Sequence, residues 1–237
     1  MNWLTRLARS RAPLAPEHAL GVQRYAASRM DDAACPLEGQ RLVVVDVETS
    51  GLSPRTDHLI AIGAVASHGN VVRFDDSFYA VLRQEKPSAT ENILVHGIDG
   101  TTQTQAPDPA RSLVDFLAYA QKSPLVGFHA EFDRAFIART MREVLGVAVE
   151  NVWLDLADLA PALYPEHAAR AHTLDDWTGR FGIANYARHD ALADAVATAQ
   201  LLQVLVARAA ERNLTRLADL VARAKEQRWL AHSLKSF

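Results

Sequence analysis

Asp46 and Glu48 end an apolar, largely β-branched run that begins at Arg41. If this run forms a β-strand, side chains two residues apart point to the same face, so both carboxylates lie on one side of the strand. Neighbouring carboxylates withdrawn from water need a counter-charge, and hard divalent cations favour oxygen ligands. The pair therefore indicates a metal site, although acids also occur commonly at exposed strand ends.

Two later blocks make this interpretation more specific. Residues 43–54, which contain the first acid pair, are followed by residues 125–137 and residues 187–202, and each later block contains a further aspartate. The arrangement resembles the DEDDh exonuclease family, which includes the proofreading epsilon subunit of bacterial replicative DNA polymerase, ribonuclease T and oligoribonuclease. The resemblance covers residues 41–205.

The resemblance implies a set of catalytic residues. Asp46 and Glu48 match the two acids of the family's first block, Asp133 matches the aspartate of its Phe-Asp pair, and His189 and Asp194 match its final motif. The four acids are then expected to hold two divalent metal ions, Mg²⁺ or Mn²⁺, with Asp46 as the bridging ligand. Two metals about 3.5–4 Å apart activate water and stabilise the transition state and leaving oxygen of phosphodiester hydrolysis. His189, with an ordinary pKa near 6.5, is expected to accept the proton of the attacking water.

The same resemblance implies residues that contact the substrate. Thr49 is expected to help position the 3' end, and Leu52 to wedge against the terminal base. His96 belongs to a His-Gly-Ile triplet that matches a family segment, where its role is contact or structure. His129 stands where many relatives have Asn, and it either contacts the nucleotide or completes the packing. Phe132, in the Phe-Asp pair, is expected to contact the substrate.

These residues predict a metal-dependent 3'→5' exonuclease that acts at nucleic-acid 3' ends. Single-stranded or frayed DNA is favoured over RNA, because an RNase T-like role needs a distinct basic patch and this chain has a formal charge of -3. A DNA polymerase subunit is a candidate partner. The alternatives are an exoribonuclease of the RNase T or oligoribonuclease type, a non-catalytic binding module of the same fold, and a phosphohydrolase suggested by the His189-Asp190 doublet.

An α/β fold must position these groups. β-Branched runs at 41–47, 59–66 and 71–82 predict an antiparallel three-stranded start, with a hairpin turn at Gly69 and Asn70. Helical periods and short apolar runs then alternate, with helices expected at 109–121 and 131–145 and strands at 123–128 and 149–155. The pattern predicts a mixed sheet flanked by helices, which the resemblance identifies as ribonuclease H-like.

Polar residues near the last motif are interpreted as structural. Thr173 and Asp176 have the spacing of a capping box, and Asp190 is a candidate N-cap for the last catalytic helix. Asp155 and Asp158 have no recognised partner spacing and are interpreted as structural or solvated, as is Asp175.

Three parts of the chain are expected: an N-terminal extension at 1–40, an exonuclease domain at 41–205, and a C-terminal helical segment at 206–237. The opening residues predict a short amphipathic helix, with a transit peptide as the weaker alternative; its apolar residues are Trp3, Leu4 and Leu7. Asn213 is expected to break the last helical region in two. The single cysteine excludes an intramolecular disulfide, and no apolar run approaches the roughly 20 residues that span a bilayer. A cytoplasmic protein that avoids membranes is predicted.

Overall fold

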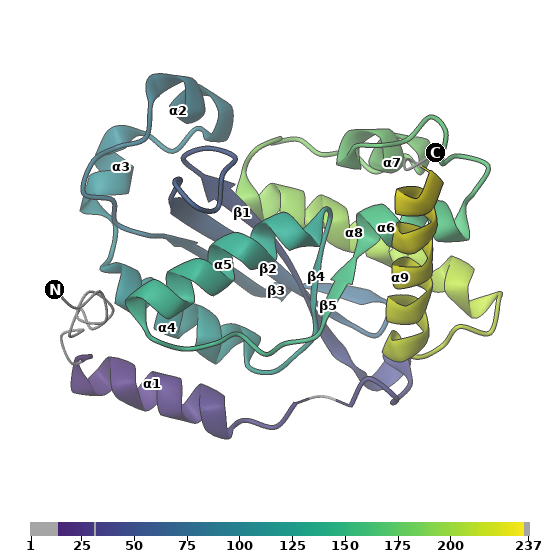
Figure 1. The fold of residues 1–237 in the computed structure, drawn as a ribbon, viewed down its shortest axis with the longest axis horizontal. Helices are drawn as coiled ribbons and strands as arrows, with labels where there is room; N and C mark the ends of the chain where they lie inside the picture. Colours follow the sequence, from purple (N-terminus) through teal and green to yellow (C-terminus); the bar gives the residue numbers. More distant parts are fainter. Residues whose placement is uncertain (1–13, 31, 235–237) are drawn as a thin grey trace, which may run out of the picture.

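The structure is a computed structural model that describes residues 14–30 and 32–234. Five strands form one sheet in the order β3-β2-β1-β4-β5, and helices cover both of its faces (Figure 1). The strands are β1 (Arg41–Thr49), β2 (Leu59–His68), β3 (Val71–Val81), β4 (Leu125–Gly127) and β5 (Trp153–Asp155). The pairs β1–β2 and β2–β3 are antiparallel, whereas β1–β4 and β4–β5 are parallel. The predicted mixed sheet with an antiparallel start is confirmed.

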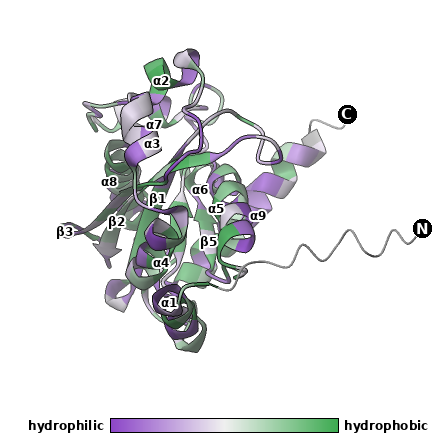
Figure 2. Ribbon diagram, turned by 90° about the vertical axis from the view of Figure 1, so that its left-hand side faces the viewer, coloured by the Kyte–Doolittle hydropathy of each residue, from purple (hydrophilic) through white to green (hydrophobic). Residues whose placement is uncertain are grey.

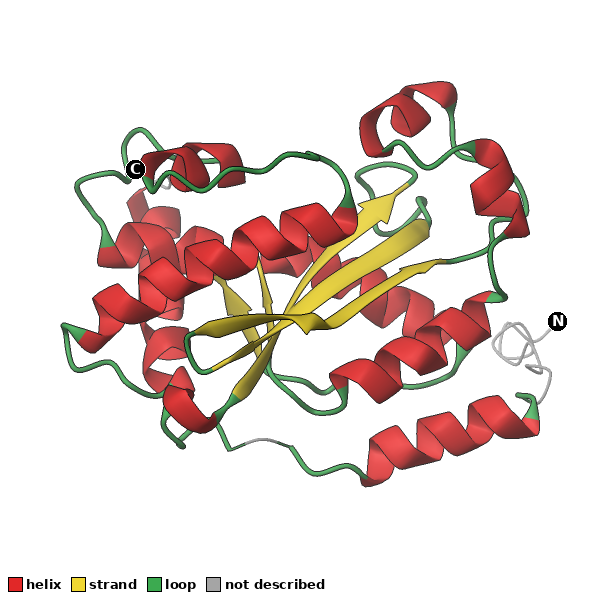
Figure 3. Cartoon of the chain, turned by 180° about the vertical axis from the view of Figure 1, so that it is seen from behind, coloured by secondary structure: helices red, strands yellow, loops and turns green. Residues whose placement is uncertain are grey.

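Among the described helices, the 20-residue α8 crosses the sheet (Figure 3). The helices are α1 (Pro16–Ala27), α2 (Thr90–His96), α3 (Gly100–Gln105), α4 (Pro109–Ala120), α5 (Ala130–Val144), α6 (Leu156–Leu163), α7 (Leu174–Arg180), α8 (Ala191–Ala210) and α9 (Leu217–Leu234), with a 3₁₀ turn at Leu37–Gly39.

Alternation along β1 divides the hydrophobic core into two layers. Leu42 and Val44 belong to the cluster formed with α6, α8 and α9, whereas Val43, Val45 and Val47 belong to the cluster formed with α4 and α5. The hydrophobic colouring in Figure 2 gathers at the centre of the molecule, where the sheet meets these helices. Because side chains alternate along a strand, the two acids of β1 continue the α8 face beyond its apolar residues.

Several local predictions are confirmed. Thr173 and Asp176 form a capping box at the start of α7, and the Asp190 side chain accepts from the Ala193 N–H at the start of α8. Asn213, with a φ of 60°, lies in the break between α8 and α9.

One prediction needs correction. The last strand was expected over 149–155, but only Trp153–Asp155 is extended against β4, since β4 itself has three residues to pair with. The hairpin turn predicted at Gly69 and Asn70 joins β2 to β3, and of these two residues, both of which can adopt a positive φ, only Gly69 does so, with a φ of 58°.

α8 also corrects the expectation that no apolar run approaches a bilayer span. By length and composition the 20 residues of Ala191–Ala210 pass that test. In the structure α8 packs across β1 and β2, and its buried residues belong to the core on that face. Its apolar composition is therefore that of a central core helix.

α1 and α9 come from the two ends of the described chain, and each packs on other elements of the fold. α1 lies along α4, and its buried Tyr25 donates to Asn151 Oδ1 at 2.7 Å. α9 packs on α6 and β5. The amphipathic helix predicted around Trp3, Leu4 and Leu7 lies outside the described residues.

Candidate active site

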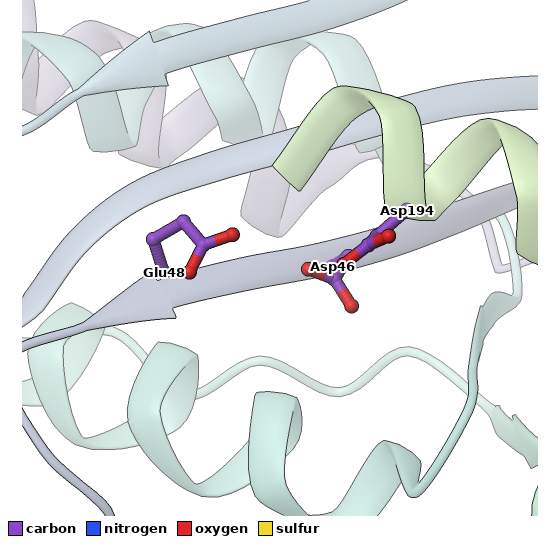
Figure 4. A group of neighbouring side chains, drawn as sticks. All are labelled: Asp46, Glu48 and Asp194. Carbon is purple, nitrogen blue, oxygen red and sulfur yellow. The ribbon is translucent and has the colours of Figure 1, made fainter. Parts of the chain in front are cut away.

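Three carboxylates meet where β1 ends and α8 begins (Figure 4). One carboxylate oxygen each from Asp46, Glu48 and Asp194 lie within 4.8 Å of one another. β1 supplies the first two from one face of the strand. Asp194 comes from the first turn of α8, where it is buried.

The close approach of α8 depends on a missing side chain. Gly63 of β2 pairs directly with Asp46, and a Cβ at Gly63 would lie 2.2 Å from the backbone carbonyl carbon of Ala191. Only glycine therefore lets the first turn of α8 rest on β2 beside Asp46. This contact brings Asp194 to the acids of β1.

The fourth predicted acid, Asp133, reaches the group from α5. Its side chain is buried in the first turn of that helix. The nearby Asp46 carboxylate makes Asp133 harder to ionise. Asp133 is not part of the tight oxygen cluster formed by the other three acids. α5 and α8 thus bring one aspartate each to the end of β1 from opposite faces of the sheet.

Three of the four acids, Asp46, Glu48 and Asp133, lie in an environment that opposes their ionisation. Burial raises the pKa of Asp46 well above its ordinary value, and the Asp194 carboxylate raises it further. Burial and the carboxylates of Asp46 and Asp194 raise the pKa of Glu48 to about 9. Burial and the nearby Asp46 raise the pKa of Asp133. The protein supplies too little positive charge to balance these carboxylates, and a bound cation would supply it.

The donor set fits a hard divalent metal. All four side chains offer carboxylate oxygens, which are the ligands that Mg²⁺ and Mn²⁺ prefer. Among the described residues, the carboxylate oxygens of Asp46, Glu48 and Asp194 lie close enough together to share one ion. The arrangement therefore supports a metal-binding acidic cluster.

Asp194 is held by three donors from the loop before α8. The Asn185 amide and the Arg188 guanidinium each donate to its carboxylate, and the His189 N–H donates to Oδ2 at 3.1 Å. Arg188 also pairs with Asp175, at 2.8 Å between Nε and Oδ1. This loop fixes the orientation of Asp194 before any ligand arrives.

His189 lies in that loop, before the first turn of α8. Its φ of 64° is in the left-handed region, so the backbone turns sharply between Arg188 and Asp190. The turn directs its N–H to Asp194 while the residue lines the same cavity as the acids.

All ten residues that the sequence predicted for the site line one cavity of about 530 Å³. They are Asp46, Glu48, Thr49, Leu52, His96, His129, Phe132, Asp133, His189 and Asp194. The acids form its floor, and residues from α2, α5 and the loop after β1 form the walls. A cavity of this size can hold the end of a chain-like ligand.

The walls differ in how firmly each residue is held. Leu52 is 85% exposed at the mouth, whereas the Thr49 hydroxyl donates to the Gly51 carbonyl at 2.7 Å. His96 is buried, its Nδ1 accepts from the Ile98 N–H at 3.0 Å, and its Nε2 lies 3.3 Å from the Ser88 hydroxyl. Burial lowers the pKa of His96. These contacts give His96 a structural part in shaping the wall.

His129 and Phe132 form the wall on the α5 side. The His129 ring packs edge-on against Phe128 at 4.9 Å between ring centroids, and the His129 backbone N–H donates to Asp155 Oδ1 at 3.0 Å. Phe132 packs on Phe136 at 4.9 Å between ring centroids. The packing expected for His129 is thus present, and the residue still faces the cavity.

Sequence reasoning missed several cavity residues. Arg188 is the only Lys or Arg among the described residues that line the cavity, and its place directly before His189 was the available signal. Asn92 and Val95 also line it from α2. Asn185 acts through Asp194 from nine positions earlier in the chain, a spacing that follows no regular period.

Comparison with known proteins identifies relatives of the chain. A family model described as exonuclease, of the RNase T type, matches residues 43–202. A DNA polymerase III PolC-type protein of Thermotoga petrophila is 27% identical, and the match covers 84% of this chain and 15% of that protein. A DNA polymerase III subunit epsilon-like protein of Rhodobacter capsulatus is 32% identical, with 82% of this chain and 28% of that protein covered. The chain spans less than a third of the length of either relative.

Solved structures share the fold. Escherichia coli exonuclease I in complex with a dT13 oligonucleotide matches with a TM-score of 0.62 at 17% identity, over 73% of this chain and 42% of that one. Exonuclease X in complex with 5' overhanging duplex DNA matches with a TM-score of 0.61 at 17% identity, over 77% of this chain and 99% of that one. At such identities the likeness shows a common fold alone.

The family model spans more than half of the chain and contains all four acids and His189. It includes the three motif blocks from which the resemblance was first inferred. The chain belongs to the DEDDh exonuclease family.

Proposed function

We propose that this protein is a metal-dependent 3'→5' exonuclease that removes nucleotides from the 3' ends of single-stranded or frayed DNA. The observation that carries the proposal is the carboxylate trio, whose oxygens lie within 4.8 Å of one another on the floor of a cavity large enough for a terminal nucleotide. The family membership supports the reaction class. The mixed sheet disfavours the phosphohydrolase alternative, which requires an all-helical fold.

The four acids and His189 have different roles in the proposed hydrolysis. Asp46, Glu48, Asp133 and Asp194 would hold two divalent ions, Mg²⁺ or Mn²⁺, with Asp46 in the bridging position. The bound ions would supply charge neutralisation, a water of lowered pKa and stabilisation of the departing 3' oxygen. A ring nitrogen of His189 accepts the proton of the attacking water. His189 has its left-handed φ of 64° just before α8 and lines the same cavity as the acids.

Apolar and cationic groups around the mouth would position the nucleic acid. Leu52 and Val95 are exposed and line the cavity from the loop after β1 and from α2, so together with Phe132 they can contact the terminal base. Thr49 would hold the 3' end. Arg188 presents the only guanidinium of the described cavity residues and can meet a phosphate oxygen.

Replication or repair of DNA in the cytoplasm is the setting that fits this activity. Relatives are named as polymerase III proteins, so a DNA polymerase subunit is a proposed partner. An exoribonuclease of the RNase T or oligoribonuclease type is the second candidate, because the described cavity residues include no feature that would reject a 2'-hydroxyl. A non-catalytic binding module is disfavoured by the complete set of four acids and His189.

The test compares single-stranded DNA and RNA of matched sequence, incubated with the protein in Mg²⁺, in Mn²⁺ and in EDTA. The proposal predicts shortening of DNA that EDTA abolishes, with slower shortening of RNA. Faster cleavage of RNA would favour the exoribonuclease. Binding of either strand without cleavage would leave the binding module.

A further inference from the structure

The C-terminal helix α9 reaches the wall of the active site through one side chain. α9 lies beyond residues 43–202 that match the exonuclease family. Arg228 of α9 contacts Asp155 at the end of β5, at 3.1 Å between Nη2 and Oδ2, and Asp158 in α6, at 2.6 Å between Nε and Oδ2. One guanidinium thus joins α9 to two acids of the catalytic domain.

Asp155 uses its other oxygen for the active-site wall. Oδ1 accepts from the His129 N–H and from the Ala157 N–H, both at 3.0 Å, and the side chain is only 10% exposed. With Oδ2 held by Arg228, the carboxylate is fixed at both oxygens and cannot rotate freely. Arg228 therefore determines how firmly Asp155 presents Oδ1 to His129.

His129 is a position where such support matters. Its φ of 61° lies in the left-handed region, which costs energy for a residue with a Cβ. It immediately precedes α5, whose first turn carries Phe132 and Asp133. A firm hold on the His129 backbone therefore fixes the cavity wall that His129 forms.

We propose that Arg228 is a positioning residue: through Asp155, helix α9 holds the His129 wall of the active site in the shape that receives the 3'-terminal nucleotide. This inference rests on the proposed function for its effect on substrate, but the structural link from Arg228 to His129 can be measured without activity.

The first experiment measures amide hydrogen exchange in peptides that cover residues 128–133. Arg228→Gln removes the guanidinium, and Asp158→Asn is the matched control, because Asp158 binds the same guanidinium whereas the His129 N–H donates to Asp155. Exchange is expected to be roughly tenfold faster in Arg228→Gln than in wild type, and close to wild type in Asp158→Asn. Arg228→Lys, which restores a cation, should recover part of the protection. Equal exchange in Arg228→Gln and Asp158→Asn overturns the inference, whatever the nuclease assay gives.

The second experiment separates KM from kcat on a 5'-labelled single-stranded oligodeoxynucleotide. Arg228→Gln is expected to raise KM by roughly three- to tenfold while kcat changes by less than about twofold, because the metal-binding acids are untouched. In the double variant with His129→Ala, KM should be no higher than in His129→Ala alone, since both changes disable the same wall. Additive effects, or a loss confined to kcat, contradict the proposal.

The two experiments distinguish the inference from the function on which it rests. A wild-type protein that cleaves no nucleic acid refutes the proposed function and leaves hydrogen exchange as the test of the Arg228 link. A wild-type protein that cleaves DNA, with KM unchanged in Arg228→Gln, refutes the inference and leaves the function intact.

Discussion

At the scale of single residues, the site is a set of acids whose charges are not balanced by the protein. Arg188 is paired with both Asp194 and Asp175, so it offsets only part of the negative charge. Burial and mutual repulsion raise the pKa values of Asp46 and Glu48. Folding therefore stores unfavourable electrostatics here that a bound cation would relieve.

Replacing one acid should consequently stabilise the metal-free protein while removing metal binding. We expect Asp46→Asn to raise Tm in EDTA, by about 2–4 °C for each kcal/mol of repulsion relieved in a chain of this length. Mg²⁺ or Mn²⁺ should raise the Tm of wild type and leave that of Asp46→Asn unchanged. Thermal melts of both proteins, with Asp115→Asn on the exposed face of α4 as the control, measure this. A lower Tm for Asp46→Asn in EDTA contradicts the electrostatic account.

His189 should matter for the rate and not for metal binding. His189→Asn is the suitable change, because Asn tolerates the left-handed φ of 64° better than other residues and cannot serve as the base at neutral pH. We expect kcat to fall by roughly two to four decades. Metal-induced stabilisation should match that of wild type. An unchanged kcat would remove His189 from the proposed role.

At the scale of elements, the site depends on how closely α8 packs against β2. Gly63 permits this contact, because any Cβ there meets the backbone of Ala191. Gly63→Ala should move the first turn of α8, and Asp194 with it, away from Asp46. We expect weaker stabilisation by Mn²⁺ and lower cleavage in a protein that still folds. Gly39→Ala is the matched control, since a Cβ at Gly39 meets nothing within 4 Å. Equal metal response in the two variants would show that α8 is placed by other contacts.

A pH-dependent ion pair joins β1 to β3 within the sheet. Arg41 donates to Asp76 from Nε and Nη2 at 2.8 Å, and this hydrogen bonding, opposed by burial and aided by His68, lowers the pKa of Asp76 to about 2. The folded-state pKa is below the ordinary value near 3.9, so this stabilisation is complete above about pH 4 and disappears as the pH falls toward 2.

Urea unfolding between pH 5 and pH 2 tests this ion pair. Wild type should lose about 1–2 kcal/mol more than Asp76→Asn over that interval, after allowance for solvent screening. Asp75→Asn, whose partner Arg73 lies on the exposed side of the same strand, serves as the control. Parallel pH profiles for wild type and Asp76→Asn would contradict the assigned pKa.

At the scale of the whole molecule, the sequence predicted the α/β architecture because its signals are local. The apolar run before Asp46 predicts a strand, and the breaks around Gly69 and Asn213 predict where elements end. Each of these signals lies in residues that are neighbours in the sequence. β5 was overestimated because its length is set by pairing with β4, which is not visible in its own residues. The 20 residues of α8 are apolar enough to span a bilayer, and only their packing across β1 and β2 shows that they form a core helix.

The residues of the candidate site likewise fall into those that the sequence predicts and those that it does not. Nine of the ten predicted residues that line the cavity come from the three motif blocks, and His96 comes from a separate triplet, because family resemblance carries them as a set. The contacts of Arg188, Asn185 and Arg228 could not, because each joins segments whose separation follows no periodicity. The proposed division of the chain at residues 40 and 205 stays a prediction, although α1 packs on α4 and α9 packs on α6 and β5.

The most direct test of the central claim is the direction of cleavage. Two single-stranded oligodeoxynucleotides of one sequence, labelled at the 5' end or at the 3' end, are incubated with wild type and with Asp46→Asn in Mg²⁺. The account predicts that the 5'-labelled strand shortens to a descending ladder, that the 3' label is released at once as a mononucleotide, and that Asp46→Asn leaves both strands whole. A ladder from the 3'-labelled strand, or cleavage by Asp46→Asn, would contradict it.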